Sequence, residues 1–199
     1  MSAWIAAHFW WIDVAIAAGI LAAVAAFVAA RRMSFLTARL FALGCAVGLM
    51  WEIPLSALDG LGVARIFQFL SPPPYPFPVI IVSHTLWDGG LFLAGVALVR
   101  ALGPGPVFAS FSARDLTVLL SWGQLQELGI ELLATGTAGW TYVPAAWNPP
   151  LFAFRGHSIT LVPQLMWFAG VLIFYPAALR LRARSAPGAT SGAGAGFTA

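Results

Sequence analysis

Lysine is absent from the 199-residue sequence, and charged side chains of all kinds make up only 9% of it. An average soluble domain carries about 25% charged residues, so this stock is too small to cover the surface of a water-soluble fold. The basic residues are all arginines, and most lie at the ends of apolar runs. That placement indicates membrane anchors rather than a nucleic-acid surface, so no nucleic-acid partner is expected.

Cysteine is nearly absent as well. The single Cys45 lies inside an apolar run. One cysteine excludes an internal disulfide framework and any metal motif built on several cysteines.

Hydrophobic residues, in contrast, make up 60% of the chain. They form runs near the roughly 20 residues that a helix needs to cross a hydrocarbon core about 30 Å thick. The sequence therefore predicts an all-α polytopic integral membrane protein, with residues 1–184 forming one bundle of five transmembrane helices. We expect the spans at residues 11–31, 35–57, 77–100, 114–135 and 157–180.

The arginines predict the orientation of this bundle. Eight of them flank the turns that follow the first, third and fifth spans: Arg31, Arg32, Arg39, Arg100, Arg114, Arg180, Arg182 and Arg184. Because basic residues favour the cytoplasmic side, the N-terminus is expected outside and the C-terminus inside, in a bacterial cytoplasmic membrane. Residues 185–199 are predicted to be a disordered cytoplasmic tail, since their Ala, Gly, Ser and Thr cannot bury a core.

The connections between spans differ in character. Residues 58–76 and 136–156, on the outer side, are rich in proline and aromatic residues, and such loops could form a lid at headgroup level. On the inner side, Ser112 and Asp115 have the spacing of a capping box that starts the fourth helix.

Several ionisable residues fall within the predicted spans. Each costs at least about 2.5 kcal/mol in the bilayer centre, so it needs a partner, a cavity or a function. Residues three or four apart share a helix face, which pairs His84 with Asp88 and Glu127 with Glu131. The fifth helix is expected to carry a similar stripe of His157, Thr160, Gln164 and Trp167. With Glu52 included, these groups all converge on the outer half of the membrane.

The tryptophans fall into two groups, one at the ends of the predicted spans and one within them. Trp10, Trp11, Trp140 and Trp147 fit interfacial anchors, and Asp13 beside the first two is expected to be interfacial too. Trp51 and Trp87, within spans, each precede an acid directly. A carboxyl group beside aromatic rings suits a reaction in which the acid protonates an alkene and the rings stabilise the cation.

These patterns give a set of candidate residues. The expected acid/base residues are Glu52, Asp88, Glu127 and Glu131, with His84 as a relay. The expected substrate-binding residues are Trp51, Trp87, Trp122, Gln124, His157, Gln164 and Trp167. No cofactor and no metal are assigned, and a homo-oligomer is left open.

Several strings resemble the emopamil-binding protein family of sterol double-bond isomerases and their relatives. The strings are Met50-Trp51-Glu52, Leu86-Trp87 through Val99-Arg100, Ser121-Trp122-Gly123-Gln124 through Glu131, and Gln164-Leu165-Met166-Trp167. The resemblance covers roughly residues 40–180. It implies a five-helix membrane protein with acid/base residues in a cavity open to lipid.

The resemblance also implies roles for single residues. Glu52 takes the place of the family's second-span acid, Gln164 that of an Asn, and Trp167 that of a cation-stabilising Trp. The family's His one turn before that acid is Gly48 here, and its third-span Glu falls near the apolar Ile80. The Trp-Glu and Trp-Asp pairs are also similar to those of integral-membrane terpene cyclases.

The leading hypothesis is an enzyme that isomerises or cyclises an isoprenoid or sterol-like lipid by acid/base chemistry. A first alternative is a non-catalytic small subunit, or a lipid- or pigment-binding protein, of a larger membrane complex. A second is a metal-dependent membrane enzyme, because two His and four carboxylates equal the ligand count of a di-iron centre.

Overall fold

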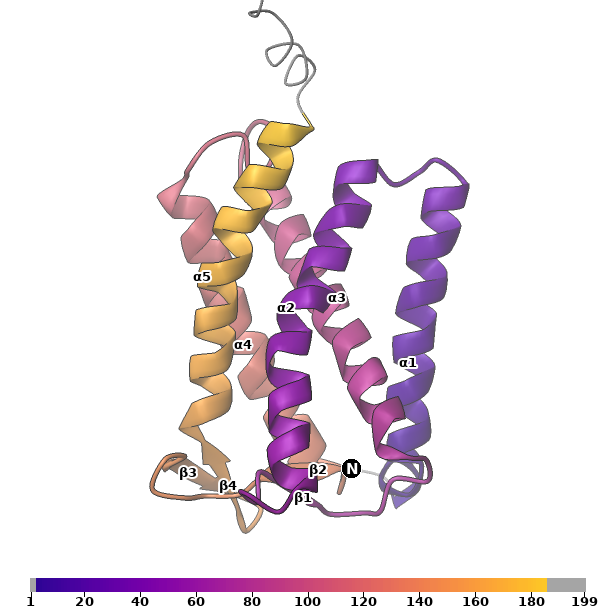
Figure 1. Ribbon diagram of the computed structural model, residues 1–199, viewed down its shortest axis with the longest axis vertical. Helices are drawn as coiled ribbons and strands as arrows, with labels where there is room; N and C mark the ends of the chain where they lie inside the picture. Colours follow the sequence, from indigo (N-terminus) through magenta and orange to yellow (C-terminus); the bar gives the residue numbers. More distant parts are fainter. Residues whose placement is uncertain (1–2, 186–199) are drawn as a thin grey trace, which may run out of the picture.

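The computed structural model describes residues 3–185, and the tail predicted to be disordered lies almost wholly outside them. Within the described residues the chain forms five long helices joined into one bundle (Figure 1). These are α1 (Ala3–Ala29), α2 (Phe35–Gly60), α3 (Phe77–Leu102), α4 (Ala113–Gly136) and α5 (Leu161–Arg184). In that part of the chain four of them, all but α4, are long and apolar enough to cross a membrane, as expected of an integral membrane protein.

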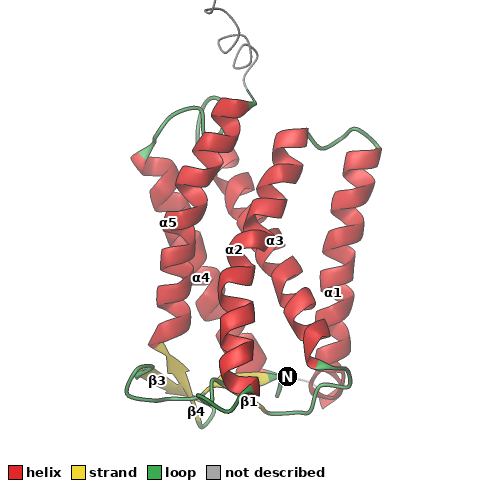
Figure 2. Cartoon of the chain, viewed as in Figure 1, coloured by secondary structure: helices red, strands yellow, loops and turns green. Residues whose placement is uncertain are grey.

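Four short strands add to the helices, so the fold is mostly rather than entirely helical. β1 (Phe67–Phe69) pairs with β2 (Trp140–Tyr142), and β3 (Pro150–Phe154) pairs with β4 (His157–Thr160), both antiparallel. Both sheets lie at the same end of the bundle, close to the N-terminus (Figure 2). The two proline-rich connections expected as loops therefore contain β-structure.

The predicted start of the fifth helix at residue 157 is wrong. Arg155 and Gly156 both have positive φ, 51° and 80°, and form the two-residue turn of the β3–β4 hairpin. His157 and Thr160 then belong to β4, and the helix begins only at Leu161. The three- and four-residue spacing of polar residues across this junction is therefore not a helical stripe.

α1 begins eight residues earlier than predicted, and this changes the setting of two tryptophans. Trp10 is buried inside the bundle: its indole N–H donates to the backbone oxygen of Ser71 over 2.9 Å. It packs in an apolar cluster with Ile80, Ala134 and Trp140. Trp140, also expected to be an interfacial anchor, is thus buried as well.

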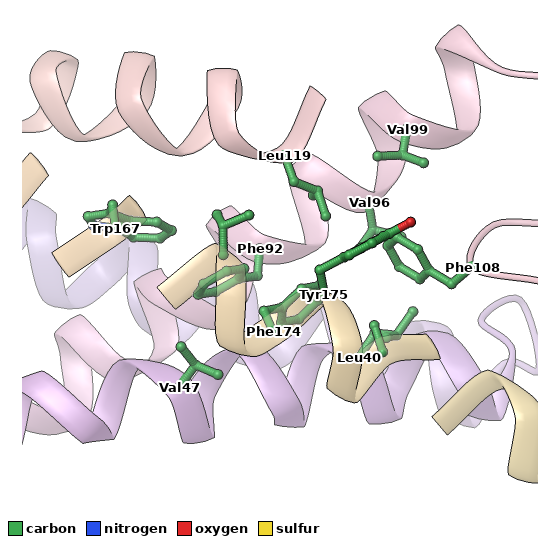
Figure 3. Packing of buried hydrophobic residues seen from close by; sticks show 12 residues of the cluster. Leu40, Val47, Phe92, Val96, Val99, Phe108, Leu119, Trp167, Phe174 and Tyr175 are labelled. Atoms are coloured by element: carbon green, nitrogen blue, oxygen red, sulfur yellow. The ribbon is translucent and has the colours of Figure 1, made fainter. Parts of the chain in front are cut away.

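The main apolar core lies between α2, α3, α4 and α5, and Figure 3 shows its buried side chains from close by. Phe174 is completely buried at its centre and stacks on Phe92, with ring centroids 4.5 Å apart. Phe92 stacks in turn on Trp167 at 4.9 Å. This stack links the core to the end of the bundle that holds the polar residues.

Glycines allow α2 and α3 to approach each other closely. A Cβ at Gly44 would lie 2.8 Å from the Cβ of Phe92, and one at Gly48 would lie 2.7 Å from the Cβ of Asp88. Real Cβ atoms do not approach this closely. Gly48 thus makes room for the Asp88 side chain.

The predicted start of the fourth helix is confirmed. The Ser112 hydroxyl accepts a hydrogen bond from the backbone N–H of Asp115, as an N-cap should. The backbone N–H of Ser112 donates to the Tyr175 hydroxyl rather than to Asp115, which pairs with Arg114. The connection between α3 and α4 is therefore tied to α5.

Candidate functional site

A cavity of about 180 Å³ lies among the helices beneath the β1–β2 sheet. It exceeds the roughly 150 Å³ of an engineered apolar cavity that binds benzene. All five helices contribute to its wall, and most of the wall is apolar. The polar residues that line it include one His and four acids: His84, Asp13, Glu52, Asp88 and Glu127.

His84 lies between two of these acids. Its Nε2 is 3.9 Å from Oδ2 of Asp13 on α1, and its Nδ1 is 3.6 Å from Oε2 of Glu52 on α2. The three side chains are only 11–20% exposed. The imidazole on α3 therefore lies between carboxyl groups of α1 and α2, in a largely enclosed position.

Asp88 and Glu127 are more deeply buried, with 6% and 4% of the residue exposed. Asp88 Oδ2 and Glu127 Oε1 have no hydrogen-bond partner. The indoles of Trp51 and Trp167 lie close to Asp88 and Glu127 respectively. A buried polar atom without a partner is unfavourable, so these two oxygens mark where a ligand or a carboxyl proton is needed.

Aromatic rings enclose the acids. Trp51 and Trp167 lie 5.5 Å apart between ring centroids, and Trp140 of β2 lies 6.3 Å from the His84 ring. Tyr142, also on β2, lines the cavity, and burial together with the nearby Glu127 raises its pKa well above the usual value. The β1–β2 sheet thus forms a roof that supplies aromatic surface and a neutral hydroxyl group.

The structure brings seven of the predicted site residues together in this cavity wall: Glu52, His84, Asp88, Glu127, Trp51, Trp87 and Trp167. Their positions in the spans predicted a similar depth for most of them, and the packing of α2, α3, α4 and α5 makes them neighbours. Trp87 also donates a 3.3 Å hydrogen bond from its indole to the backbone oxygen of Asp13.

Five predicted residues lie outside the wall. Glu131 is fully buried and accepts a 3.0 Å hydrogen bond from the backbone N–H of Thr160, where β4 meets α5. Trp122 donates to the backbone oxygen of Leu91, and Gln124 donates to that of Gln164, so both tie helices together. The remaining two are Gln164, whose buried Nε2 has no partner, and His157, which pairs with Phe154 on the hairpin.

Among the lining residues that the sequence gave no site role, three are polar or aromatic neighbours of the acids: Asp13, Trp140 and Tyr142. Asp13 was expected at the interface because it stands near the start of an apolar run. The longer α1 places it eleven residues into the chain's first helix and against α3, where it accepts a 2.7 Å hydrogen bond from the Ser83 hydroxyl. Trp140 and Tyr142 reach the cavity only through strand pairing.

The metal alternative finds no support in the geometry of the site. Within residues 3–185 no three His, Cys, Asp or Glu side chains lie close enough together to hold a metal ion. Glu131, one of the four carboxylates in the di-iron count, bonds to Thr160 instead.

Comparison with protein-family models, with curated proteins and with solved structures finds no match to this chain. The function of the site has therefore to be inferred from its residues and their arrangement.

Proposed function

We propose that the protein is an integral-membrane enzyme that isomerises or cyclises an isoprenoid or sterol-like lipid by acid/base chemistry. The observation that carries this proposal is the cavity itself, in which four acids and a His share an apolar, aromatic-lined space. Such a space suits a lipid that enters from the bilayer. The resemblance to sterol isomerases and terpene cyclases agrees with it but rests on short motifs.

The acids support both halves of such a reaction. Asp88 and Glu127 are deeply buried, and each keeps one carboxyl oxygen without a hydrogen-bond partner, which suits both as carriers of a proton toward a ligand. Glu52 lies beside His84 and is suited to accept a proton. One carboxyl O–H adds its proton to an alkene carbon, a carbocation forms, and a carboxylate removes a proton from a neighbouring carbon. The net reaction moves a double bond or closes a ring without any co-reactant.

The tryptophans support the intermediate of this reaction. A cation placed over an indole face within about 6 Å is attracted by the ring quadrupole. Trp51, Trp140 and Trp167 approach the cavity from three different elements. A carbocation that forms between them would be shielded from water and stabilised from more than one side.

We further propose that α4 is a fifth span. Its low hydropathy comes from residues such as Gln126, Glu127 and Glu131, which are buried inside the bundle, whereas Leu125 and Leu133 are 69% and 56% exposed. Its 24 residues give a length of about 36 Å, enough to cross. With the arginine-rich turns on the cytoplasmic side, the N-terminus and the β-sheets face outward. Membrane-impermeant labelling of cysteines introduced at Trp147 or Ser110 tests this orientation.

Deuterium incorporation tests the chemistry even before the substrate is identified. The purified protein in vesicles is incubated in D₂O with isoprenoid lipids extracted from the source membranes, and the lipids are analysed by mass spectrometry. Because the added proton comes from a solvent-exchangeable carboxyl group, each turnover places one deuteron on carbon. We expect a lipid whose mass rises by one unit with unchanged carbon count.

Matched variants separate catalysis from binding. Glu52→Gln, Asp88→Asn and Glu127→Gln should each lower incorporation about a hundredfold or more, since a positioned acid or base contributes at least about that factor. Asp115→Asn, an equal change at the far end of α4, should not. If a lipid co-purifies but never gains deuterium, the non-catalytic alternative replaces this proposal. Full incorporation in all three cavity variants would also reject it.

A further inference from the structure

Asp13 is held in place by two hydrogen bonds, one to its side chain and one to its backbone. Its carboxylate accepts a 2.7 Å hydrogen bond from the hydroxyl of Ser83. Its backbone oxygen accepts a 3.3 Å hydrogen bond from the indole N–H of Trp87. Both partners lie on α3, the helix that also carries His84. The carboxylate is thereby fixed next to the imidazole although it belongs to a different helix.

We infer that Asp13 is a positioning residue that, together with Glu52, holds His84 as an imidazolium cation beside the acid/base carboxyl group of Glu52. The two acids face opposite nitrogens of the ring, at 3.9 Å from Nε2 and 3.6 Å from Nδ1. A neutral imidazole donates from one nitrogen only, whereas an imidazolium donates from both. Only the protonated ring therefore presents an N–H to each carboxylate.

The surroundings of His84 agree with this assignment. The groups that face it are Asp13 from α1, Glu52 from α2, Glu127 from α4 and, from β2, the uncharged Trp140 ring. Asp88 lies one helical turn further along α3, Tyr142 of β2 also lines the cavity, and α5 contributes no titratable group to the wall. Among the described residues that line the cavity, His84 is the only possible cation. Removal of either flanking acid therefore weakens the electrostatic stabilisation of the imidazolium form.

This role rests on the proposed function in one respect, namely that Glu52 exchanges protons during turnover. When Glu52 takes a proton from the carbocation, the neighbouring imidazolium favours its return to a carboxylate, and the proton passes to water that enters the cavity. The His84 side chain is 20% exposed, so the cavity is not sealed around it. Asp13 is not itself placed on the reacting atoms.

Nitrogen NMR of the imidazole rings tests the inference and needs no substrate. The chain has three histidines, so protein labelled with ¹⁵N-histidine in detergent micelles gives few signals, which His8→Asn and His157→Asn variants assign. We expect His84 to be an imidazolium at neutral pH in the wild type. In Asp13→Asn its ratio of imidazolium to neutral ring should fall about tenfold or more, because loss of a nearby opposite charge is worth at least one pH unit.

Control variants distinguish charge from structure. Asp13→Glu keeps the charge and should restore the imidazolium, and Asp115→Asn should leave the His84 signals unchanged. An unchanged His84 signal in folded Asp13→Asn would overturn the inference, even if deuterium incorporation is intact. A shifted signal without any deuterium incorporation in the wild type would support the inference and reject the proposed function.

Discussion

The contact between Gly48 and Asp88 predicts that even an added methyl group at position 48 lowers the stability of the bundle. Gly48→Ala would place a Cβ 2.7 Å from the Asp88 Cβ and 2.8 Å from its Cγ, so α2 and α3 must separate or Asp88 must turn. Overpacking of this kind costs about 1–3 kcal/mol. The helix itself gains up to about 1 kcal/mol from a Gly→Ala change.

A matched substitution isolates the packing cost. Gly129 also lies inside a helix, but a Cβ there meets nothing within 4 Å. Gly129→Ala has the same helix gain without the clash, so the two variants should differ by about 1–3 kcal/mol in unfolding free energy. Denaturant unfolding in mixed micelles, followed by circular dichroism, measures this difference.

The Gly48→Ala and Gly129→Ala variants also test the position of Asp88 in the site. Because Asp88 is displaced in Gly48→Ala, deuterium incorporation should fall in that variant and not in Gly129→Ala. Equal stability of the two variants, with equal incorporation, would show that the Asp88 carboxyl group does not rest against Gly48 and would refute the packing on which its position depends.

Other parts of the bundle give further predictions. Glu131→Leu should cost about 1–3 kcal/mol of stability, because the buried N–H of Thr160 loses its acceptor, while Glu131→Gln keeps an acceptor oxygen and should lose less. Phe174→Ala, at the fully buried centre of the core, should cost about 3–5 kcal/mol. Burial, with a smaller effect from the Asp13 carboxylate, raises the pKa of Tyr75, whose hydroxyl donates to the backbone oxygen of Trp10. The neutral phenol therefore contributes its full stability below the unfolded value of about 10. That contribution is lost at higher pH, so unfolding curves should show wild type and Tyr75→Phe converging above pH 10.

The helices were predictable because each membrane span is a continuous run of apolar residues that can be recognised locally in the sequence. Runs of apolar residues with arginine at their ends gave α2 and α3 to within a few residues. The end of the β3–β4 hairpin left a weaker record, since Arg155 is not a residue typical of a position with positive φ. The polar spacing of the strand residues was therefore mistaken for a helix.

The site was predictable to the extent that it depends on spacing within single helices. His84 and Asp88 share a face of α3 by their separation alone, so their convergence followed from the sequence. Asp13 contacts Ser83 across two helices, and no local pattern reports such a contact. Glu131 was predicted for the site because it shares a helix face with Glu127. Its carboxylate instead accepts a hydrogen bond from Thr160 at the start of α5.

The roof of the cavity also has a consequence for how the protein is made. β1 follows α2 in the chain, whereas its partner β2 follows α4, and Phe67 pairs with Tyr142. Pairing over so long a separation is slow, because the chain between must first be ordered. During synthesis the four helices α1 to α4 are made before β2, so until β2 is complete the acids face an unroofed space. The cavity is therefore closed on its sheet side only after the chain has been made at least as far as Tyr142.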